Sequence, residues 1–342
     1  MQARTIIAAA VAAVLLAAGA VQADVFNMDP NIYGPNVKSL ETVPVGDPGY
    51  GGVAYTYNIG KYEVTAGQYT EFLNAVAATD TYGLYDPNMA SGGMWVCGGC
   101  QIAQSGNSGN YTYSVASDWA NRPVNFVSWG DAARFANWLH NGHPTGAQNL
   151  STTEDGAYYL NGATTDEQLL AATRKANWKW AITNEDEWHK GGYYDPNKPG
   201  GAGFWAFPTG TDAIPGTGGR PDADPENEAN FMDQWNGQIG PWWTVFGPQT
   251  TPVGYFSASD SPYGTFDQGG NVQEWCEPGS LLGGEYMLPS DCLQFSWEAG
   301  YYQARTYSDT FSGFRVSEVP EPGSAVLLIA GAVAVFRRRA MR

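Results

Sequence analysis

Three stretches of the chain place apolar residues at helical spacing behind a polar residue that can cap a helix. Thr65 precedes a segment whose apolar positions 69, 72, 73 and 76 fall on one face. Ser128 precedes a second such segment, with Asp131 three residues later as in a capping box, and the pattern stops at residues 141–142 (NG). Asn184 precedes a third, with Glu187 at its third position. We predict helices over these three segments.

Between these segments the pattern predicts short strands and long loops. Residues 55–62 alternate as in a strand, residues 122–127 form a short strand before the second helix, and residues 178–180 form a buried strand. Residues 84–113 are rich in Gly, Ser and Asn, which indicates a long loop. After position 191, Gly and Pro break every pattern, and tryptophans lie between them. The 13 tryptophans and 43 glycines therefore predict a core of aromatic side chains packed between irregular loops.

The first 23 residues have the order of a secretory signal peptide. Arg4 supplies the positive start, residues 6–21 are apolar, and small residues occupy positions 21 and 23. A membrane anchor is the alternative, but the run is rich in Ala and ends at a cleavage site. We therefore predict a signal peptide over residues 1–23, an irregular segment over 24–49 and one domain over 50–317, with signal peptidase as a processing partner.

The C-terminal residues 318–342 carry a second sorting pattern. Residues 320–322 (PEP) precede an apolar run over 324–336 and four arginines. A helix of those thirteen residues rises about 20 Å, less than the roughly 30 Å of a bilayer core. This order resembles the PEP-CTERM sorting signal, which implies processing by an exosortase in Gram-negative bacteria that often make extracellular polysaccharide. An ordinary tail anchor is the alternative. We expect the protein at the cell surface, at the outer membrane or outside the cell.

The charge of the mature protein is strongly negative. Of the 17 Lys and Arg, Arg4 and the four C-terminal arginines lie in the sorting segments, which leaves 12 against 34 Asp and Glu, a net charge of about −22. Nucleic acid is excluded as a partner, because its binding requires cationic side chains at the phosphates. An acidic protein of this kind is compatible with calcium or with a well-solvated surface.

Four cysteines are compatible with two disulfides in an exported protein. They are Cys97, Cys100, Cys276 and Cys292. Of the three possible connectivities, we favour the pairing of sequence neighbours. Residues 97–100 (CGGC) have half the spacing of a zinc site, but no second pair has matching spacing.

Five short motifs follow one another in an order that identifies a family. They are residues 61–65 (KYEVT), 123–129 (PVNFVSW), 184–188 (NEDEW), 270–275 (GNVQEW) and 312–316 (SGFRV). This succession resembles the sulfatase-modifying-factor family, whose best-known member is the formylglycine-generating enzyme. The resemblance implies a single α+β domain with the C-type-lectin-like fold of that enzyme and little regular secondary structure.

The family's enzymes oxidise a sulfatase cysteine to formylglycine with oxygen and a copper ion held by two cysteines. In the matching stretch, Glu285 replaces the Ser of the motif and Leu288 stands in place of the first cysteine. Cys292, the one candidate catalytic residue, lies one position from the second. A lone thiolate cannot give the two-sulfur coordination that Cu(I) favours. We therefore expect no copper catalysis, and we expect a disulfide between Cys292 and Cys276.

Family members also bind calcium through oxygen ligands, which a hard cation prefers. The resemblance places one site at the side chains of Asn271 and Glu274 with backbone carbonyls of Gly270 and Val272, and a second at Asn230 and Phe231. The alternative is that Asn271 caps a turn and Glu274 pairs with an arginine. Another branch of the family binds iron through histidines of an additional helical domain that this chain lacks, so we expect no iron.

Three functions are compatible with these observations. The first is a non-catalytic exported module that binds a polysaccharide or a protein, with aromatic residues such as Trp242 and Trp243 stacking on sugar rings. The second is an oxidase in which Cys292 acts with another group. The third is a structural component of a polysaccharide matrix.

Overall fold

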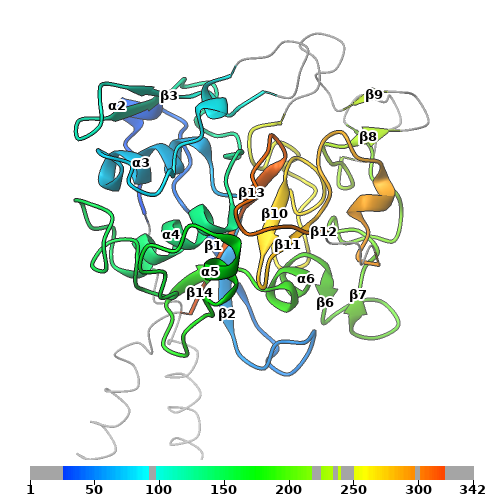
Figure 1. Cartoon of the computed structure of the whole chain (residues 1–342). Coiled ribbons are helices and arrows are strands. Elements are labelled where there is room, and N and C mark those ends of the chain that lie inside the picture. The colour runs from blue at the N-terminus through cyan, green and yellow to red at the C-terminus, as the bar shows by residue number, and fades with distance from the viewer. Residues whose placement is uncertain are drawn as a thin grey trace, which may run out of the picture. The chain divides into compact units, whose positions relative to one another are not determined.

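The computed structural model describes residues 26–91, 98–217, 225–233, 238–239, 250–296 and 301–319 (Figure 1). Phe26–Val319 forms one compact unit of mixed helices and short strands, which is the predicted α+β domain. The predicted signal peptide, the predicted C-terminal sorting signal from Pro320 on, and Trp242–Trp243 lie outside the described residues. Among the described helices, none has both the length and the apolar character needed to cross a membrane.

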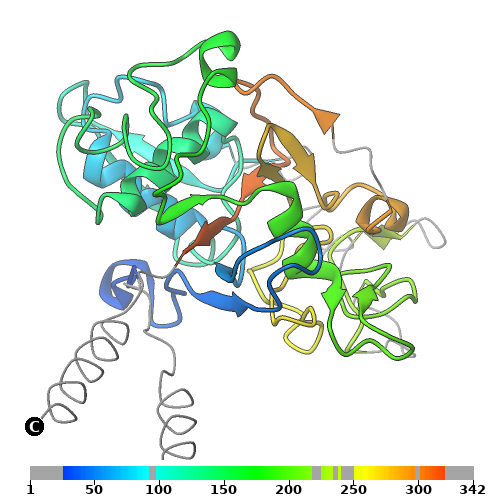
Figure 2. The ribbon, with the colours of Figure 1, turned by 90° about the horizontal axis from the view of Figure 1, so that it is seen from below.

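A four-stranded antiparallel sheet joins the two ends of this unit. Its order is β1 (Thr42–Val45), β2 (Tyr57–Gly60), β14 (Val316–Glu318) and β5 (Trp180–Ile182). The last strand in the sequence thus lies between strands from the first and second thirds of the chain (Figure 2). β1 belongs to the stretch predicted to be irregular, so that prediction is wrong at residues 42–45.

A second sheet carries the 270–275 motif. Its order is β12 (Tyr301–Tyr302), β11 (Ser280–Leu282), β10 (Gln273–Cys276) and β13 (Ser312–Phe314), and β10 and β13 run parallel. All four residues of β10 are buried, so this strand has core on both faces. The remaining strands pair as β3 (Ile102–Ser105) with β4 (Thr112–Val115), β6 (Tyr194–Asp195) with β7 (Gly203–Phe204), and β8 (Met232–Asp233) with β9 (Gln238–Ile239).

The three predicted helices are confirmed, and each has the predicted N-cap. They are α3 (Ala66–Val76), α4 (Trp129–His140) and α6 (Glu185–Tyr193), and every one carries a complete capping box. In these boxes the side chains of Thr65, Ser128 and Asn184 accept from the backbone N–H three residues on, which satisfies a donor that the helix leaves free. Short helical turns lie at α2 (Pro30–Tyr33), α5 (Asp166–Leu170), η1 (Pro87–Ala90) and η2 (Ser290–Leu293).

Two predicted strands differ from the structure. The buried strand expected at 178–180 lies two residues later, at β5. Residues 124–127 form no strand, because Phe126 has a φ of 56°, in the left-handed region. The predicted long loop over 84–113 contains η1 and β3, and it ends in β4.

The main core is aromatic, as predicted. Phe72, Phe135 and Phe314 meet edge to face with ring centroids 5.3 Å apart in each adjacent pair. Trp275 is fully buried, and its indole N–H donates to the carbonyl of Val127 at 2.9 Å. This core packs α3 and α4 against the two sheets and so fixes the strands that carry the site residues.

Candidate functional site

The family motifs meet at a tight turn around Asn271. The backbone N–H of Asn271 donates to the carbonyl of Asn230 at 2.9 Å. Gly270 has a φ of 87°, and a Cβ at this position would lie 2.2 Å from the same carbonyl. Only glycine fits here, because the backbone is left-handed and because the segment around Asn230 passes so close to it. The structure therefore brings together Asn230, Gly270 and Asn271, which the sequence had assigned to two separate sites.

The side chain of Asn271 links the 270–275 motif to the 61–65 motif and to Asn230 and Thr251 by hydrogen bonds. Its Oδ1 accepts from the backbone N–H of Thr251 at 2.9 Å and from Asn230 Nδ2 at 3.2 Å. Its Nδ2 donates to Glu63 Oε1 at 3.0 Å. All of these groups are buried. The carboxamide is thus held as a structural connector, and its oxygen already accepts two donors.

Glu274 pairs with an arginine, as the alternative interpretation proposed. Arg315 Nη2 donates to Glu274 Oε1 and Arg315 Nε to Glu274 Oε2, both at 2.6 Å. Trp188 Nε1 donates to the second oxygen at 2.7 Å. The remaining guanidinium N–H groups of Arg315 reach the carbonyls of Gly60 and Phe266, each at 2.9 Å. Three motifs therefore meet in one buried, bidentate ion pair.

Negative charge exceeds positive charge around this pair. Glu63 and Asp267 lie near Glu274, so three carboxyl groups surround the single guanidinium of Arg315. Burial, followed by the charges of Asp267 and Glu274, raises the pKa of Glu63 well above its usual value. Burial also raises the pKa of Asp267 to about 6, although the N–H of Gly254, at 2.6 Å, opposes this shift.

The fit of this region to calcium depends on which oxygens remain without a donor. Glu274 uses both oxygens for Arg315 and Trp188, whereas the buried Oε2 of Glu63 has no hydrogen-bond partner among the described residues. An unpaired buried carboxylate oxygen with surplus negative charge around it suits a hard cation. Within the described ranges, no group of three or more His, Cys, Asp or Glu side chains is placed to hold a metal ion. Calcium stays a prediction, and Glu63 fits it better than Glu274.

Val272 and Phe231, whose carbonyls were also predicted as calcium ligands, are both buried. Phe231 packs with Phe207, Ala229, Cys292 and Leu293 in a small cluster. The structure thus places one predicted calcium residue, Phe231, in the same cluster as the predicted catalytic cysteine, Cys292.

The predicted disulfide between Cys276 and Cys292 is wrong, because both thiols are free. Cys276 ends β10 and packs with Trp188 and Tyr193, where its Sγ lies 3.6 Å from Thr183 Oγ1. Cys292 lies on η2 in the separate cluster around Phe207. The irregular backbone carries the two cysteines into different apolar clusters, which the sequence pattern could not show. Cys100 is free as well, and its predicted partner Cys97 lies outside the described residues.

Cys292 does not fit the family's copper chemistry. Burial, with the charges of Asp291 and Glu285, raises the pKa of its thiol to about 11. The thiol therefore stays protonated near neutral pH, whereas a soft metal needs the thiolate. Leu288 packs against the same cluster in place of the first family cysteine. None of the described cysteines pairs with Cys292.

Glu285, which replaces the Ser of the family motif, is buried beside this region. Its Oε2 accepts from the backbone N–H of Met287 at 2.6 Å. Burial raises the pKa of Glu285 to about 8, and the charge of Asp309 adds to the shift. A carboxyl group in this position is neutral at moderate pH and adds no copper ligand there.

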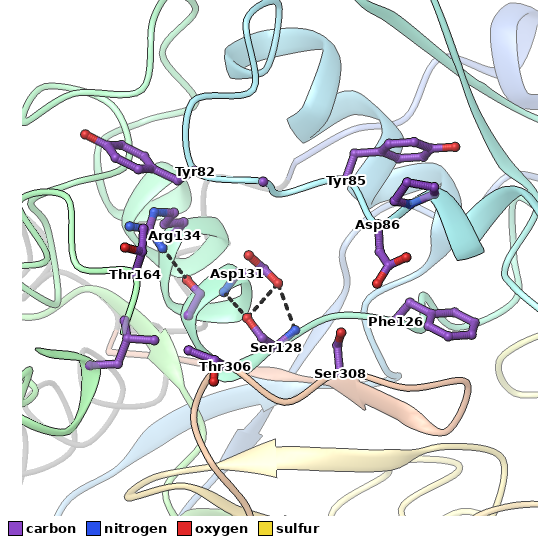
Figure 3. Close-up of a pocket in the computed structure, with 14 residues that line it drawn as sticks. Tyr82, Tyr85, Asp86, Phe126, Ser128, Asp131, Arg134, Thr164, Thr306 and Ser308 are labelled. Atoms are coloured by element: carbon purple, nitrogen blue, oxygen red, sulfur yellow. Dashed lines mark hydrogen bonds between the residues drawn. The ribbon is translucent and has the colours of Figure 1, made fainter. Parts of the chain in front are cut away.

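A polar pocket of about 270 Å³ lies at the N-terminal end of α4 (Figure 3). Segments far apart in the sequence contribute to it: the loop around Tyr82 and Asp86, the first turn of α4, and the segment around Ser308. The residues that line it are Tyr82, Gly83, Tyr85, Asp86, Pro87, Phe126, Ser128, Gly130, Asp131, Arg134, Thr164, Leu169, Thr306 and Ser308.

The capping box of α4 positions Asp131 in this pocket. Asp131 Oδ2 accepts from the backbone N–H and the hydroxyl of Ser128, at 2.8 and 2.6 Å (Figure 3). Burial raises the pKa of Asp131 to about 6, although the bonds from Ser128 and the charge of Arg134 oppose this shift. At neutral pH the group is therefore mainly a carboxylate.

Comparisons with known proteins agree with the motif order. A sequence model of the sulfatase-modifying factor enzyme 1-like domain, called FGE-sulfatase, matches residues 13–318. The chain belongs to this family. A comparison with curated proteins finds no match.

A comparison with solved structures finds similar chains at low sequence identity. Treponema denticola variable protein 1 is 16% identical, with 83% of this chain and 96% of that chain covered and a TM-score of 0.46. CarF is 20% identical, with 82% of this chain and 98% of CarF covered and a TM-score of 0.44. PvdO from Pseudomonas aeruginosa is 15% identical, with 81% of this chain and 90% of PvdO covered and a TM-score of 0.41.

In this FGE-sulfatase chain, the sequence interpretation missed the pocket and the role of Glu63. Ser128 and Asp131 were recognised only as a helix cap, because one sequence shows the cap but not the loops that close over it. Glu63 stands 208 positions from Asn271, so no local pattern connects them. The one available signal was the acidic residue inside the KYEVT motif, which is unusual between buried neighbours.

Proposed function

We propose that this chain is an exported, surface-associated binding module that has kept the FGE-sulfatase scaffold and lost its copper chemistry. The observation that carries the proposal is the state of Cys292. Its thiol is buried, its pKa is raised to about 11, and Leu288 occupies the place of a second sulfur ligand. Without a second thiolate beside Cys292 among the described residues, the linear coordination that Cu(I) prefers is missing there. The finer assignment of a C-type-lectin-like fold is part of the same proposal.

Binding is the function that remains for the scaffold. The pocket at α4 is a concave site with polar and aromatic walls, as ligand sites are. Export rests on the signal-peptide pattern of residues 1–23 and on the PEP-CTERM pattern of residues 318–342. A short apolar segment followed by arginines would hold the tail on the cytoplasmic side until an exosortase processes it.

Calcium as a stabilising ion is a further part of the proposal. Glu63 and Asp267 would hold it beside Asn271, and its charge would offset the surplus of buried carboxylates. The support is the buried Glu63 Oε2, which has no hydrogen-bond partner in the part of the chain that the structure describes. Protonation of Glu63 is the other way to remove that surplus charge.

The experiment that tests the non-catalytic assignment uses the mature protein purified after secretion. It is incubated with copper, oxygen and a peptide containing a sulfatase cysteine motif, and the peptide is followed by mass spectrometry. A catalytically active formylglycine-generating enzyme serves as the positive control. We expect an unchanged peptide mass. The mass loss of thiol-to-aldehyde conversion, abolished by Cys292→Ser, would replace this proposal with the oxidase function.

The matrix-component function is separated by fractionation. A surface binding module should be found on the cells or in the medium, in either case free of polysaccharide. A matrix component should sediment with the polysaccharide, and digestion of that polysaccharide should release it.

A further inference from the structure

The pocket at α4 contains polar groups that the protein itself does not use. The hydroxyls of Thr164, Thr306 and Ser308 make no hydrogen bond with any described residue. Asp131 Oδ1 is also without a donor there, since both bonds from Ser128 go to Oδ2. Figure 3 shows this oxygen turned away from Ser128. Three hydroxyls and a carboxylate oxygen are therefore available to a ligand.

Asp86 adds a second carboxylate from the opposite wall. Its Oδ1 accepts from the backbone N–H of Asn88 at 2.8 Å and so caps η1, which fixes the side chain. Its Oδ2 has no donor within the described chain. Figure 3 shows Asp86 and Ser308 on neighbouring segments of the pocket wall. Acceptors thus reach the pocket from two separate elements, α4 and the turn before η1.

The charge of the pocket excludes acidic ligands. Arg134 lines it, but its Nε and Nη2 donate to the two oxygens of Glu154 at 2.7 and 3.1 Å, with both side chains buried. Since that pair is neutral as a unit, Asp86 and Asp131 leave the pocket negative. Carboxylates only accept hydrogen bonds, so a suitable ligand must donate them, through hydroxyl or ammonium groups.

Aromatic rings supply the apolar part of the wall. Tyr82 lies over the guanidinium of Arg134, with 4.6 Å from the guanidinium carbon to the ring centroid. The hydroxyl of Tyr85 is tied to the carbonyl of Ile102 at 3.1 Å, which holds its ring in place. Phe126 reaches the pocket from a left-handed backbone conformation that bulky residues rarely adopt. Tyr85 and Phe126 also pack against the main core, so only part of each ring lines the pocket, beside the hydroxyls and carboxylates that would bind the edge of a sugar.

We propose that this pocket binds a single neutral or amino sugar unit, held by Asp86, Asp131 and Ser308 beside the aromatic rings. The inference rests on the proposed function as a binding module and names its ligand class. The volume of about 270 Å³ lies just below the range of roughly 300 Å³ upward typical of drug-sized ligands, which suits one sugar ring. An amino sugar should bind better than a neutral one, because its ammonium meets two carboxylates.

The test is a titration of the mature protein with the methyl glycosides of glucosamine, glucose and glucuronic acid, followed by saturation-transfer NMR. We expect glucosamine to bind best, glucose more weakly, and glucuronic acid not at all. Asp86→Asn should weaken glucosamine binding by about tenfold or more, because a charge-assisted bond is lost. Ser308→Ala should weaken it by roughly two- to tenfold, the value of a neutral hydrogen bond.

The chain offers a matched control for Asp86. Asp29 is exposed, precedes the same Pro-Asn pair, and caps α2 through an identical bond to Asn31 at 2.8 Å. Asp29→Asn should leave sugar binding unchanged, and both variants should keep their caps because Asn caps as well as Asp.

Each other outcome overturns the inference. Wild-type protein that binds none of the three glycosides would exclude a sugar, and equal binding of glucuronic acid would exclude the charge argument. Sugar binding that Asp86→Asn and Ser308→Ala leave intact would place the ligand elsewhere. None of these outcomes bears on the peptide-oxidation assay, so failure of the ligand class and failure of the non-catalytic assignment remain distinguishable.

Discussion

Glu274 and Arg315 face each other through two hydrogen bonds of 2.6 Å, and neither side chain is exposed to solvent. The pair joins β10 to the residue between β13 and β14, so it connects the two main sheets. Trp188 from α6 completes the arrangement through its indole N–H. One ion pair thus holds together elements that are distant in the sequence.

Removing one partner of this pair should destabilise the protein strongly. In Arg315→Met the carboxylate of Glu274 stays buried without its counter-charge, which typically costs about 3–5 kcal/mol. Urea denaturation measures the loss of unfolding free energy. The exposed pair of Lys61 and Glu41, 3.4 Å apart, provides the control, since Glu41→Gln should cost at most about 1 kcal/mol. Equal small effects of both substitutions would contradict the role given to the buried pair.

Local sequence was sufficient for the three main helices, because a capping box lies within four residues. Thr65 and Gln68 form such a box, and its two hydrogen bonds can be predicted from these two residues alone. β1 was missed because residues 42–45 become a strand only through pairing with β2. The same limit applies to the sheet as a whole, in which β14 pairs with β2 from the opposite end of the chain.

The candidate site was predictable only in part. The family motifs identified Asn271 and Glu274, and the sequence left open whether Glu274 meets a cation or an arginine. The choice depends on Arg315, which lies 41 positions away, and on which oxygens remain without donors. The failed disulfide has the same origin, since Cys276 and Cys292 are near in sequence but lie in different clusters.

Chelation should test calcium at the buried carboxylates. We expect EDTA to lower the melting temperature of the mature protein at pH 7, since an ion at 100 times its Kd adds about 2.7 kcal/mol to stability. Glu63→Gln should remove this sensitivity, because the amide takes away one of the surplus charges around Arg315. Glu41→Gln should retain it. An unchanged melting temperature with chelator would leave protonation of Glu63 as the way the charge is removed.

The thiols Cys276 and Cys292 should be free in the secreted protein. Denaturation without reductant followed by iodoacetamide should modify both, and peptide mapping should detect both modified peptides. In the native protein Cys292 should react slowly, because it is buried and its pKa is raised to about 11. A peptide pair crosslinked through Cys276 and Cys292 would show that the predicted disulfide forms after all.

Glu285 should make the protein less stable as the pH rises. Its pKa rises from 4.5 in the unfolded chain to about 8 in the folded protein, so the folded state binds more protons between these values. The free energy of unfolding therefore falls as pH increases from about 4.5 to 8. Glu285→Gln removes this dependence and can keep the bond from the N–H of Met287.

Denaturation of both proteins at several pH values measures this effect. The stability advantage of Glu285→Gln over wild type should grow from pH 4.5 to pH 8, to a few kcal/mol. A difference that stays constant over this range would mean that burial does not hold the carboxyl of Glu285 in its neutral form.

Copper binding tests the central claim most directly. The mature protein is loaded with Cu(I) under reducing conditions, passed over a desalting column with a competing Cu(I) chelator, and its copper content is measured by mass spectrometry. Because no other described cysteine lies beside Cys292 and its thiol is protonated, we expect no stoichiometric copper. One equivalent of retained copper that Cys292→Ser releases would contradict it.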